Sequence, residues 1–171
     1  ENNRKIIGFH PGAGKKDNMW PTNRFVELIK KIYEQYNNYV LLTSGWIDDM
    51  IISEVERELL RGGIPYKILN NLPIKKLGAI LSLIDLYITN DTGSMHIAGF
   101  SDAQMISLFG PTNPNEWAPT GENKYFIKSK NGILFQYAIM AAMVIRRVIK
   151  IGGTLNAFRI VVAPNFKDLF S

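Results

Sequence analysis

Cysteine is absent from the 171-residue sequence, and histidine occurs only at His10 and His96. Without cysteine the chain forms no disulfide bond and offers no thiolate to a metal ion. Zinc and redox centres depend largely on these two residue types, so we expect neither kind of centre in this protein.

Long apolar runs are also missing. The longest, residues 133–145, is interrupted by Gln136 and followed by Arg146 and Arg147. It is shorter than the roughly 20 residues that a membrane-spanning helix needs, so we expect a helix that is buried or packed against a partner. Residues 1–5 lead straight into an apolar strand, without the apolar region of a signal peptide. We therefore expect the chain to begin inside a larger protein.

The charge of the chain is moderately basic and spread along the sequence. Lys and Arg number 20 against 15 Asp and Glu, which gives a formal net charge of +5. Nucleic-acid-binding proteins usually gather positive charge on one face and add aromatic platforms, a pattern that this sequence does not show. We expect no nucleic-acid partner. The excess of basic residues indicates either a mild attraction to anionic substrates or an anionic membrane surface, or a solvated basic surface.

Composition and periodicity favour one α/β domain. The hydrophobic share of 46% and the charged share of 20% are ordinary for a globular protein. Short apolar runs alternate with segments of helical period. The sequence predicts strands at residues 5–9, 39–43, 66–69, 85–89, 105–109 and 125–128, and helices at 22–36, 48–60, 73–84 and 92–100. This alternation predicts a Rossmann-like doubly wound parallel sheet.

Two loops follow neighbouring strands of this predicted sheet. The strand at residues 85–89 leads into NDTG (residues 90–93), where Asp or Thr can cap a helix and Gly lets backbone N–H groups approach a ligand. The strand at residues 105–109 leads into GPT (residues 110–112). Because ligands of open α/β sheets bind at the carboxyl ends of the strands, the two loops predict a phosphate site. Each loop alone is equally compatible with an ordinary helix start or turn.

The same loops carry a family resemblance. NDTGSMHIA (residues 90–98) and LFGPTNPNEWAP (residues 108–119) resemble the nucleotide-sugar half of glycosyltransferase family 9, the heptosyltransferases. IIGFHPGAGKKDNMWPTNRFVELI (residues 6–29) resembles the opening strand, phosphate loop and Trp-Pro helix start of that family. The resemblance covers residues 5–128, and it implies the C-terminal half of a GT-B fold.

The domain organisation follows from this resemblance. We expect residues 1–132 to form the donor-binding domain. Residues 133–171 then form an apolar helical tail, which either belongs to the same domain or contacts a missing N-terminal domain. Within this tail the sequence predicts no role for residues 151–171.

Residue types and resemblance together give a set of candidate donor-binding residues. They are Gly12, Ala13, Gly14, Lys16, Asp48, Asp91, Thr92, Gly93, Ser94, His96 and Thr112. The small residues of the first loop permit close approach of phosphate, and Lys15 or Lys16 adds a point charge. Family members often carry a Lys two residues before the Trp of the Trp-Pro pair. This chain has Asn18 there, so we expect Lys16 to supply the charge instead.

Several of these candidates have two possible roles. We expect Thr92, Gly93 and Ser94 to donate hydrogen bonds to a diphosphate. Asp91 either caps the following helix or, as the resemblance implies, lies beside the donor sugar and accepts hydrogen bonds from its hydroxyl groups. Asp48 either meets ribose hydroxyl groups or acts as an acid at the start of a helix.

His96 follows Thr92 by four residues, so we expect it on the same side of the first helical turns, near the pocket. There it either contacts a phosphate or sugar oxygen and assists departure of the leaving group, or it is a core histidine. Thr112 and Trp117 lie on the loop that the resemblance places over the nucleotide or sugar. We expect Trp117 to be either a stacking wall or a buried anchor.

The resemblance implies an inverting transfer of a heptose or another sugar from a nucleotide diphosphate sugar, such as ADP-heptose, to a lipopolysaccharide-type acceptor. The sequence contains no Asp-x-Asp pair, which favours a metal-independent route without a cofactor. In the resembled enzymes the general base and the glycolipid acceptor site belong to the N-terminal domain. We therefore expect this chain to bind donor but to lack activity alone.

Two other functions are compatible with the sequence. One is a non-catalytic nucleotide-binding module that docks a partner through its apolar tail. The other is a nucleotide-sugar epimerase-like enzyme on the same architecture. For the transferase we expect a cytoplasmic location, with peripheral association at the inner face of the cytoplasmic membrane.

Overall fold

The computed structural model describes residues 4–129 and 159–161 of the chain. Its strands are β1 (Ile6–His10), β2 (Tyr39–Ser44), β3 (Tyr66–Asn70), β4 (Leu86–Asn90), β5 (Gln104–Phe109), β6 (Lys124–Lys128) and β7 (Arg159–Val161). Its helices are the 3-10 helix η1 (Lys16–Asn18) and the α-helices α1 (Thr22–Tyr36), α2 (Asp49–Arg61), α3 (Ile74–Leu81), α4 (Gly93–Gly99) and α5 (Pro114–Trp117).

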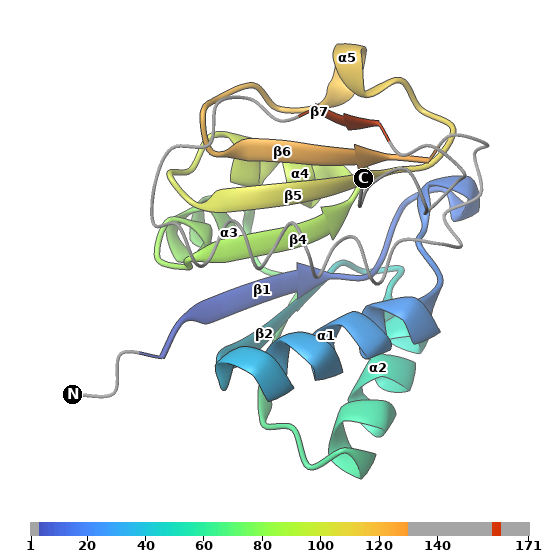
Figure 1. Cartoon of the computed structure of the whole chain (residues 1–171), viewed down its shortest axis with the longest axis vertical. Coiled ribbons are helices and arrows are strands. Elements are labelled where there is room, and N and C mark those ends of the chain that lie inside the picture. Colours follow the sequence, from blue (N-terminus) through green and yellow to red (C-terminus); the bar gives the residue numbers. More distant parts are fainter. Residues whose placement is uncertain (1–3, 130–158, 162–171) are drawn as a thin grey trace, which may run out of the picture.

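The described strands form one sheet in the order β3-β2-β1-β4-β5-β6-β7, with every neighbouring pair parallel (Figure 1). The chain builds outward from β1 through β2 and β3, then returns to add β4, β5 and β6 on the other side. In a sheet of this order, the carboxyl ends of β1 and β4 flank the crevice where ligands bind. The predicted doubly wound α/β fold is confirmed.

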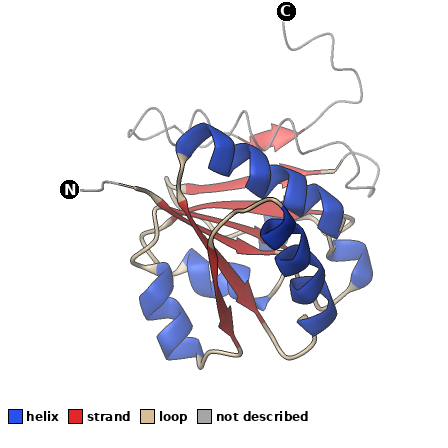
Figure 2. Cartoon of the chain, turned by 90° about the horizontal axis from the view of Figure 1, so that it is seen from below, coloured by secondary structure: helices blue, strands red, loops and turns tan. Residues whose placement is uncertain are grey.

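Helices cover both faces of the sheet (Figure 2). α1 and α2 pack together over one core, into which α1 directs Phe25, Leu28 and Ile32. These positions follow the helical spacing that the sequence predicts. α3 and α4 pack together over a second core, which contains Leu81 and Met95.

The alternation of side chains along the strands decides which polar groups reach the site. Phe9 and Ile88 lie in the core beneath α1 and α2, whereas Tyr87 lies in the core beneath α3 and α4. Successive residues of a strand point to opposite faces. His10 and Thr89 therefore lie on the same side as Tyr87, whereas the buried Asn90 at the end of β4 lies on the side of Ile88.

The predicted order of elements is confirmed, with some changes at their ends. α1 has its predicted bounds, but α3 ends at Leu81 because the chain turns after it, with the Leu83 N–H bonded to the Ile80 carbonyl three residues earlier. The short elements η1, α5 and β7 are not predicted, since three or four residues show no recognisable period. The helix predicted at residues 133–145 lies outside the described residues.

Candidate functional site

A cavity of about 290 Å³ lies at the carboxyl edge of the sheet. The loop after β1 contributes Ala13 and Gly14 to its lining, and the loop after β2 contributes residues 45–48. Residues 71–72 after β3 and residues 92–94 at the start of α4 complete these walls. The cavity thus spans the crevice between β1 and β4, where a sheet of this order binds ligands.

Two glycines leave open space at this cavity. A Cβ atom added at Gly14 or at Gly93 would meet no heavy atom within 4 Å. Neither glycine adopts a left-handed backbone conformation. The fold itself therefore does not require glycine at these positions, and the missing side chains leave room for a ligand.

The structure brings together some of the predicted site residues and separates others. Those that line the cavity are Ala13, Gly14, Asp48, Thr92, Gly93 and Ser94. Those that lie outside its lining are Gly12, Lys16, Asp91, His96 and Thr112. Gly12 lies directly behind the wall, where an added Cβ would clash with the Asp48 carboxylate.

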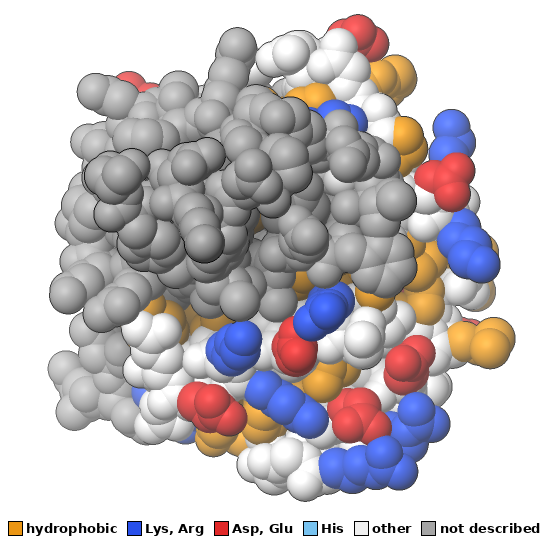
Figure 3. All heavy atoms as spheres, turned by 45° about the vertical axis from the view of Figure 1, so that its right-hand side comes forward, with side chains coloured by type: hydrophobic (Ala, Val, Ile, Leu, Met, Phe, Trp, Pro, Cys, Tyr) orange, Lys and Arg blue, Asp and Glu red, His pale blue; other side chains and the backbone are white. Residues whose placement is uncertain are grey.

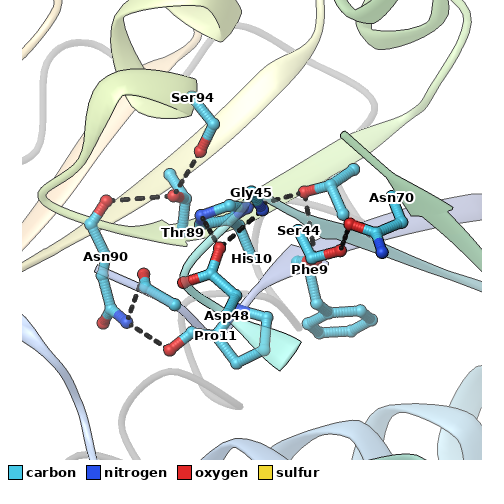
Figure 4. Close-up of polar contacts among 12 residues, drawn as sticks. Phe9, His10, Pro11, Ser44, Gly45, Asp48, Asn70, Thr89, Asn90 and Ser94 are labelled. Carbon is cyan, nitrogen blue, oxygen red and sulfur yellow. Dashed lines mark hydrogen bonds and ion pairs between the residues drawn. The ribbon is translucent and has the colours of Figure 1, made fainter. Parts of the chain in front are cut away.

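The first loop is held in place by Asn90, which the sequence does not single out as a site residue. The Asn90 side-chain amide donates to the carbonyls of Pro11 and Gly12 at 2.8 and 3.2 Å (Figure 4). Its Oδ1 accepts a hydrogen bond from the backbone N–H of Trp20 at 3.1 Å. Asn90 is fully buried. One side chain at the end of β4 therefore fixes both ends of the loop that follows β1.

Asn18 joins the first loop to the loops after β4 and β5. Its Nδ2 donates to Asp91 Oδ2 at 3.0 Å, and its Oδ1 accepts from the Thr112 hydroxyl at 3.1 Å. The helix N-cap residue is Thr92, and its side chain makes no capping hydrogen bond. Of the two roles expected for Asp91, helix capping is therefore wrong, because its carboxylate is held by Asn18 one residue before the cap.

The cations near these loops have different environments. Lys16 is exposed on η1, outside the cavity lining. The Lys128 ammonium, at the end of β6, donates to the carbonyls of Gly110 and Thr112. Burial lowers the pKa of Lys128, and the nearby Asp91 carboxylate opposes this shift. Lys128 thus adds a positive charge to the loop after β5.

His96 does not lie on the side of α4 that the sequence predicts. Its side chain is exposed, and its ring centroid lies 6.5 Å from that of Trp117 in an edge-to-face contact. Ile97 lines the cavity instead. The expected four-residue spacing from Thr92 fails because Thr92 has an extended backbone and the helix begins after it. Trp117 is 54% exposed, so it is not a buried anchor.

Asp48 lies in the cavity wall and already has protein partners (Figure 4). Its Oδ2 accepts a hydrogen bond from the Gly45 N–H at 2.6 Å and lies 3.6 Å from Nε2 of His10. Both Asp48 and His10 are buried. Burial lowers the pKa of His10, and the Asp48 carboxylate opposes this shift. At neutral pH the ring is therefore neutral.

The second ring nitrogen of His10 extends this network. Nδ1 lies 3.0 Å from Thr43 Oγ1, which is 2.7 Å from the Tyr87 hydroxyl oxygen. The Thr43 hydroxyl also donates to the Phe9 carbonyl at 3.4 Å. Burial raises the pKa of Tyr87 to about 12, so this hydroxyl remains a donor at neutral pH. The network links β1, β2 and β4 beneath the cavity.

The residues at the start of α4 form the polar end of the cavity. Thr92 is partly exposed and Gly93 is exposed, whereas Ser94 is buried. The Ser94 hydroxyl lies 3.4 Å from Thr89 Oγ1, which donates to the Asn90 carbonyl. The hydroxyl groups of Thr92 and Ser94 and the open space at Gly93 suit an oxygen-rich ligand.

On the face shown in Figure 3, basic and acidic side chains alternate over the described residues, so neither sign of charge forms a patch there. Residues 4–129 and 159–161 contain no group of three or more His, Asp or Glu side chains that is arranged to hold a metal ion. Among the same residues, no helix has the length and apolar character needed to cross a membrane.

Comparison with sequence families gives a match over most of the chain. The model of glycosyltransferase family 9 (heptosyltransferase) matches residues 1–139. The chain is 28% identical over 120 residues to lipooligosaccharide heptosyltransferase 2 of Campylobacter jejuni serotype O:2. This alignment covers 69% of this chain and 37% of the relative. It is 29% identical over 137 residues to the Haemophilus influenzae protein of the same name. That alignment covers 78% of this chain and 39% of the relative. The chain thus spans less than half the length of these relatives.

Solved structures show the same fold. The E. coli heptosyltransferase WaaC with ADP superposes with a TM-score of 0.74 at 20% identity, over 85% of this chain and 44% of that one. The E. coli ADP-heptose lps heptosyltransferase II superposes with a TM-score of 0.75 at 19% identity, over 88% of this chain and 48% of that one. In both pairs the aligned part is less than half of the solved chain.

Proposed function

Because the chain belongs to glycosyltransferase family 9, we propose that its cavity binds the nucleoside diphosphate of a nucleotide-sugar donor. The chain is then the donor-binding half of a GT-B glycosyltransferase. The observation that carries this proposal is the open space at Gly14 and Gly93, on the two loops that face each other across the crevice between β1 and β4.

The chemistry of the polar end fits a diphosphate. Gly14 and Gly93 allow phosphate oxygens to approach the backbone, and the hydroxyl groups of Thr92 and Ser94 line the same cavity. Lys15 and Lys16 extend from the first loop, where their exposed side chains are able to move toward an anion. These groups bind the donor through hydrogen bonds and fixed charges.

We propose that the reaction is a metal-independent inverting transfer of a heptose, or another sugar, to a lipopolysaccharide-type glycolipid. As the glycosidic bond breaks, negative charge develops on the departing diphosphate, and the donors at Thr92 to Ser94 stabilise it. His96 extends from the same helix but lies outside the cavity, with its ring against Trp117, so we assign it no role in departure of the leaving group. The absence of any Asp-x-Asp pair supports the metal-independent route.

We assign acceptor binding and the general base to a separate N-terminal half. The chain alone should therefore bind donor without transferring sugar. The net charge of +5 supports a location at the cytoplasmic face of the inner membrane, whose lipid surface is anionic. ADP-heptose is the proposed donor.

Calorimetric titration with ADP, UDP and GDP, with and without magnesium, tests donor binding. Gly93→Ala should keep the fold and reduce ADP affinity about tenfold or more, because the new methyl group occupies ligand space and a lost charge-assisted bond is worth roughly 1.5 to 3 kcal/mol. Gly14→Ala should act similarly. Gly78→Ala is the matched control, since its Cβ would make only an ordinary contact with Ile97.

Absence of nucleotide binding, or equal affinity in all three variants, would contradict the proposed site. Sugar transfer is then tested by fusing this chain to the acceptor half of a full-length relative. Sugar transfer by the fusion protein would support the proposed glycosyltransferase function. A non-catalytic module would bind donor and still give no transfer, and an epimerase-like enzyme would convert the donor without any acceptor.

A further inference from the structure

The cavity has two chemically different ends. Gly14, Thr92 and Ser94 form its polar end, which the proposed function assigns to the diphosphate. The strand order β3-β2-β1-β4 places the loops after β2 and β3 at the other end, where the lining includes the apolar side chains of Trp46 and Leu72 beside the Asp48 carboxylate. A nucleoside diphosphate has the same polarity, with charged phosphates at one end and a flat aromatic base at the other.

Trp46 is the most exposed of the three tryptophans. It is 84% exposed, compared with 54% for Trp117 and 0% for Trp20. The neighbouring Ile47 is also 71% exposed. An indole that lines a cavity and makes so little contact with its own chain contributes little to the core, and its aromatic face is available to a ligand.

The loop that carries Trp46 is held at its base. The Asp48 N–H bonds to the Gly45 carbonyl at 3.2 Å, and the Asp48 carboxylate accepts from the Gly45 N–H at 2.6 Å. The same carboxylate faces His10 at 3.6 Å. Beside it, Ser44 is bonded to Asn70 at 3.0 Å (Figure 4). Since both ends of the turn are closed, the loop has little conformational freedom left to lose when a ligand binds.

We propose that Trp46 is a stacking platform for the nucleobase of the donor, an assignment that rests on the proposed function of this cavity. The indole face packs against the base while the diphosphate lies at Gly14 and Gly93. Stacking does not depend on the hydrogen-bonding pattern of the base but grows with its area. Trp46 therefore favours purine over pyrimidine diphosphates, and ADP and GDP should bind more tightly than UDP.

The test compares Trp46→Ala and Trp46→Phe with the unaltered chain. The probes are ADP, UDP and inorganic pyrophosphate, which keeps the phosphates but lacks a base. Loss of one stacking contact lowers affinity by roughly 5-fold to 150-fold. Trp46→Ala should thus weaken ADP binding at least fivefold, reduce the difference between ADP and UDP, and leave pyrophosphate affinity unchanged. Trp46→Phe should restore most of the ADP affinity.

Fluorescence gives a second measurement, because a base stacked on Trp46 quenches its emission. ADP should quench the unaltered chain and Phe100→Ala, a control at an exposed aromatic side chain outside the cavity, but not Trp46→Phe. Equal ADP affinity in Trp46→Ala, or an equal loss of ADP and pyrophosphate binding, would overturn the stacking role. If neither ADP nor pyrophosphate binds the unaltered chain, the proposed function fails and the role of Trp46 fails with it.

Discussion

Replacement of Asn90 by aspartate tests whether this side chain fixes the first loop. The substitution keeps the size and shape of the side chain but exchanges the amide NH₂ for an oxygen. In the structure this NH₂ donates to the carbonyls of Pro11 and Gly12, and the residue is fully buried. The acceptor for the Trp20 N–H is retained. Asn90→Asp therefore removes two donated hydrogen bonds and places an oxygen against two carbonyls.

The magnitude follows from these two bonds. Each buried carbonyl left without a donor costs about 1 to 3 kcal/mol, so the expected loss of unfolding free energy is about 2 to 6 kcal/mol. That is a large part of the about 5 to 15 kcal/mol that stabilises a typical domain. In urea, with a slope of about 1 to 3 kcal/mol per molar, the midpoint should fall by about 0.7 M or more. ADP affinity should fall as well, because the first loop becomes less ordered.

Urea unfolding followed by circular dichroism, at several pH values, measures this effect. Burial raises the pKa of the introduced carboxyl above its unfolded value of about 3.9, so the deficit should be largest at neutral pH and narrow as the group gains a proton. Asn70→Asp, at an exposed position, is the control for the exchange of amide for carboxylate itself, because the Asn70 side chain acts as acceptor from the Ser44 hydroxyl. If Asn90→Asp loses no more stability than this control, the assigned role of Asn90 is wrong.

Two further substitutions test the wall of the cavity. Burial lowers the pKa of His10 below its unfolded value of about 6.5, so the unfolded state takes up more protons and stability should fall as pH drops from about 6.5 toward the folded pKa. In thermal unfolding, His10→Gln should make the unfolding temperature depend less on pH in this range. If the unaltered chain and the variant show the same pH dependence, His10 is not held neutral in the folded state. Gly12→Ala should destabilise the fold by more than 1 kcal/mol, roughly the cost of overpacking, because its Cβ meets the Asp48 carboxylate. Gly14→Ala is the control and should unfold at the same urea concentration as the unaltered chain. If Gly12→Ala also has this midpoint, the first loop accommodates the added methyl group and the reasoning from the clash is wrong.

The architecture was predictable because it depends on local patterns. The spacing of Phe25, Leu28 and Ile32 predicts the buried face of α1, and short apolar runs predict the strands. A parallel sheet places the carboxyl ends of its strands at one edge. The Gly-rich loops after β1 and β4 were therefore expected to lie together, and Gly14 and Gly93 do line one cavity.

The roles of individual site residues depended on details that sequence spacing does not contain. Whether Asp91 or Thr92 caps α4 is decided by a single residue at the helix start, and Asn18 holds the Asp91 carboxylate from another loop. That same boundary turns Ile97 toward the cavity and His96 away from it. A shift of one residue on a helix rotates the side chain by about 100°, so a small error in the boundary changes the assigned face.

The sequence by itself determined the order of the elements, the sheet edge at which the cavity lies and the family to which the loops belong, because these follow from local periodicity and contiguous motifs. Only the tertiary structure decided that His10 meets Asp48, that Asn90 fixes the first loop and that Trp46 remains exposed at the cavity. Each of these outcomes requires segments far apart in the chain to pack at defined distances, and burial and hydrogen-bond geometry exist only after that packing has occurred.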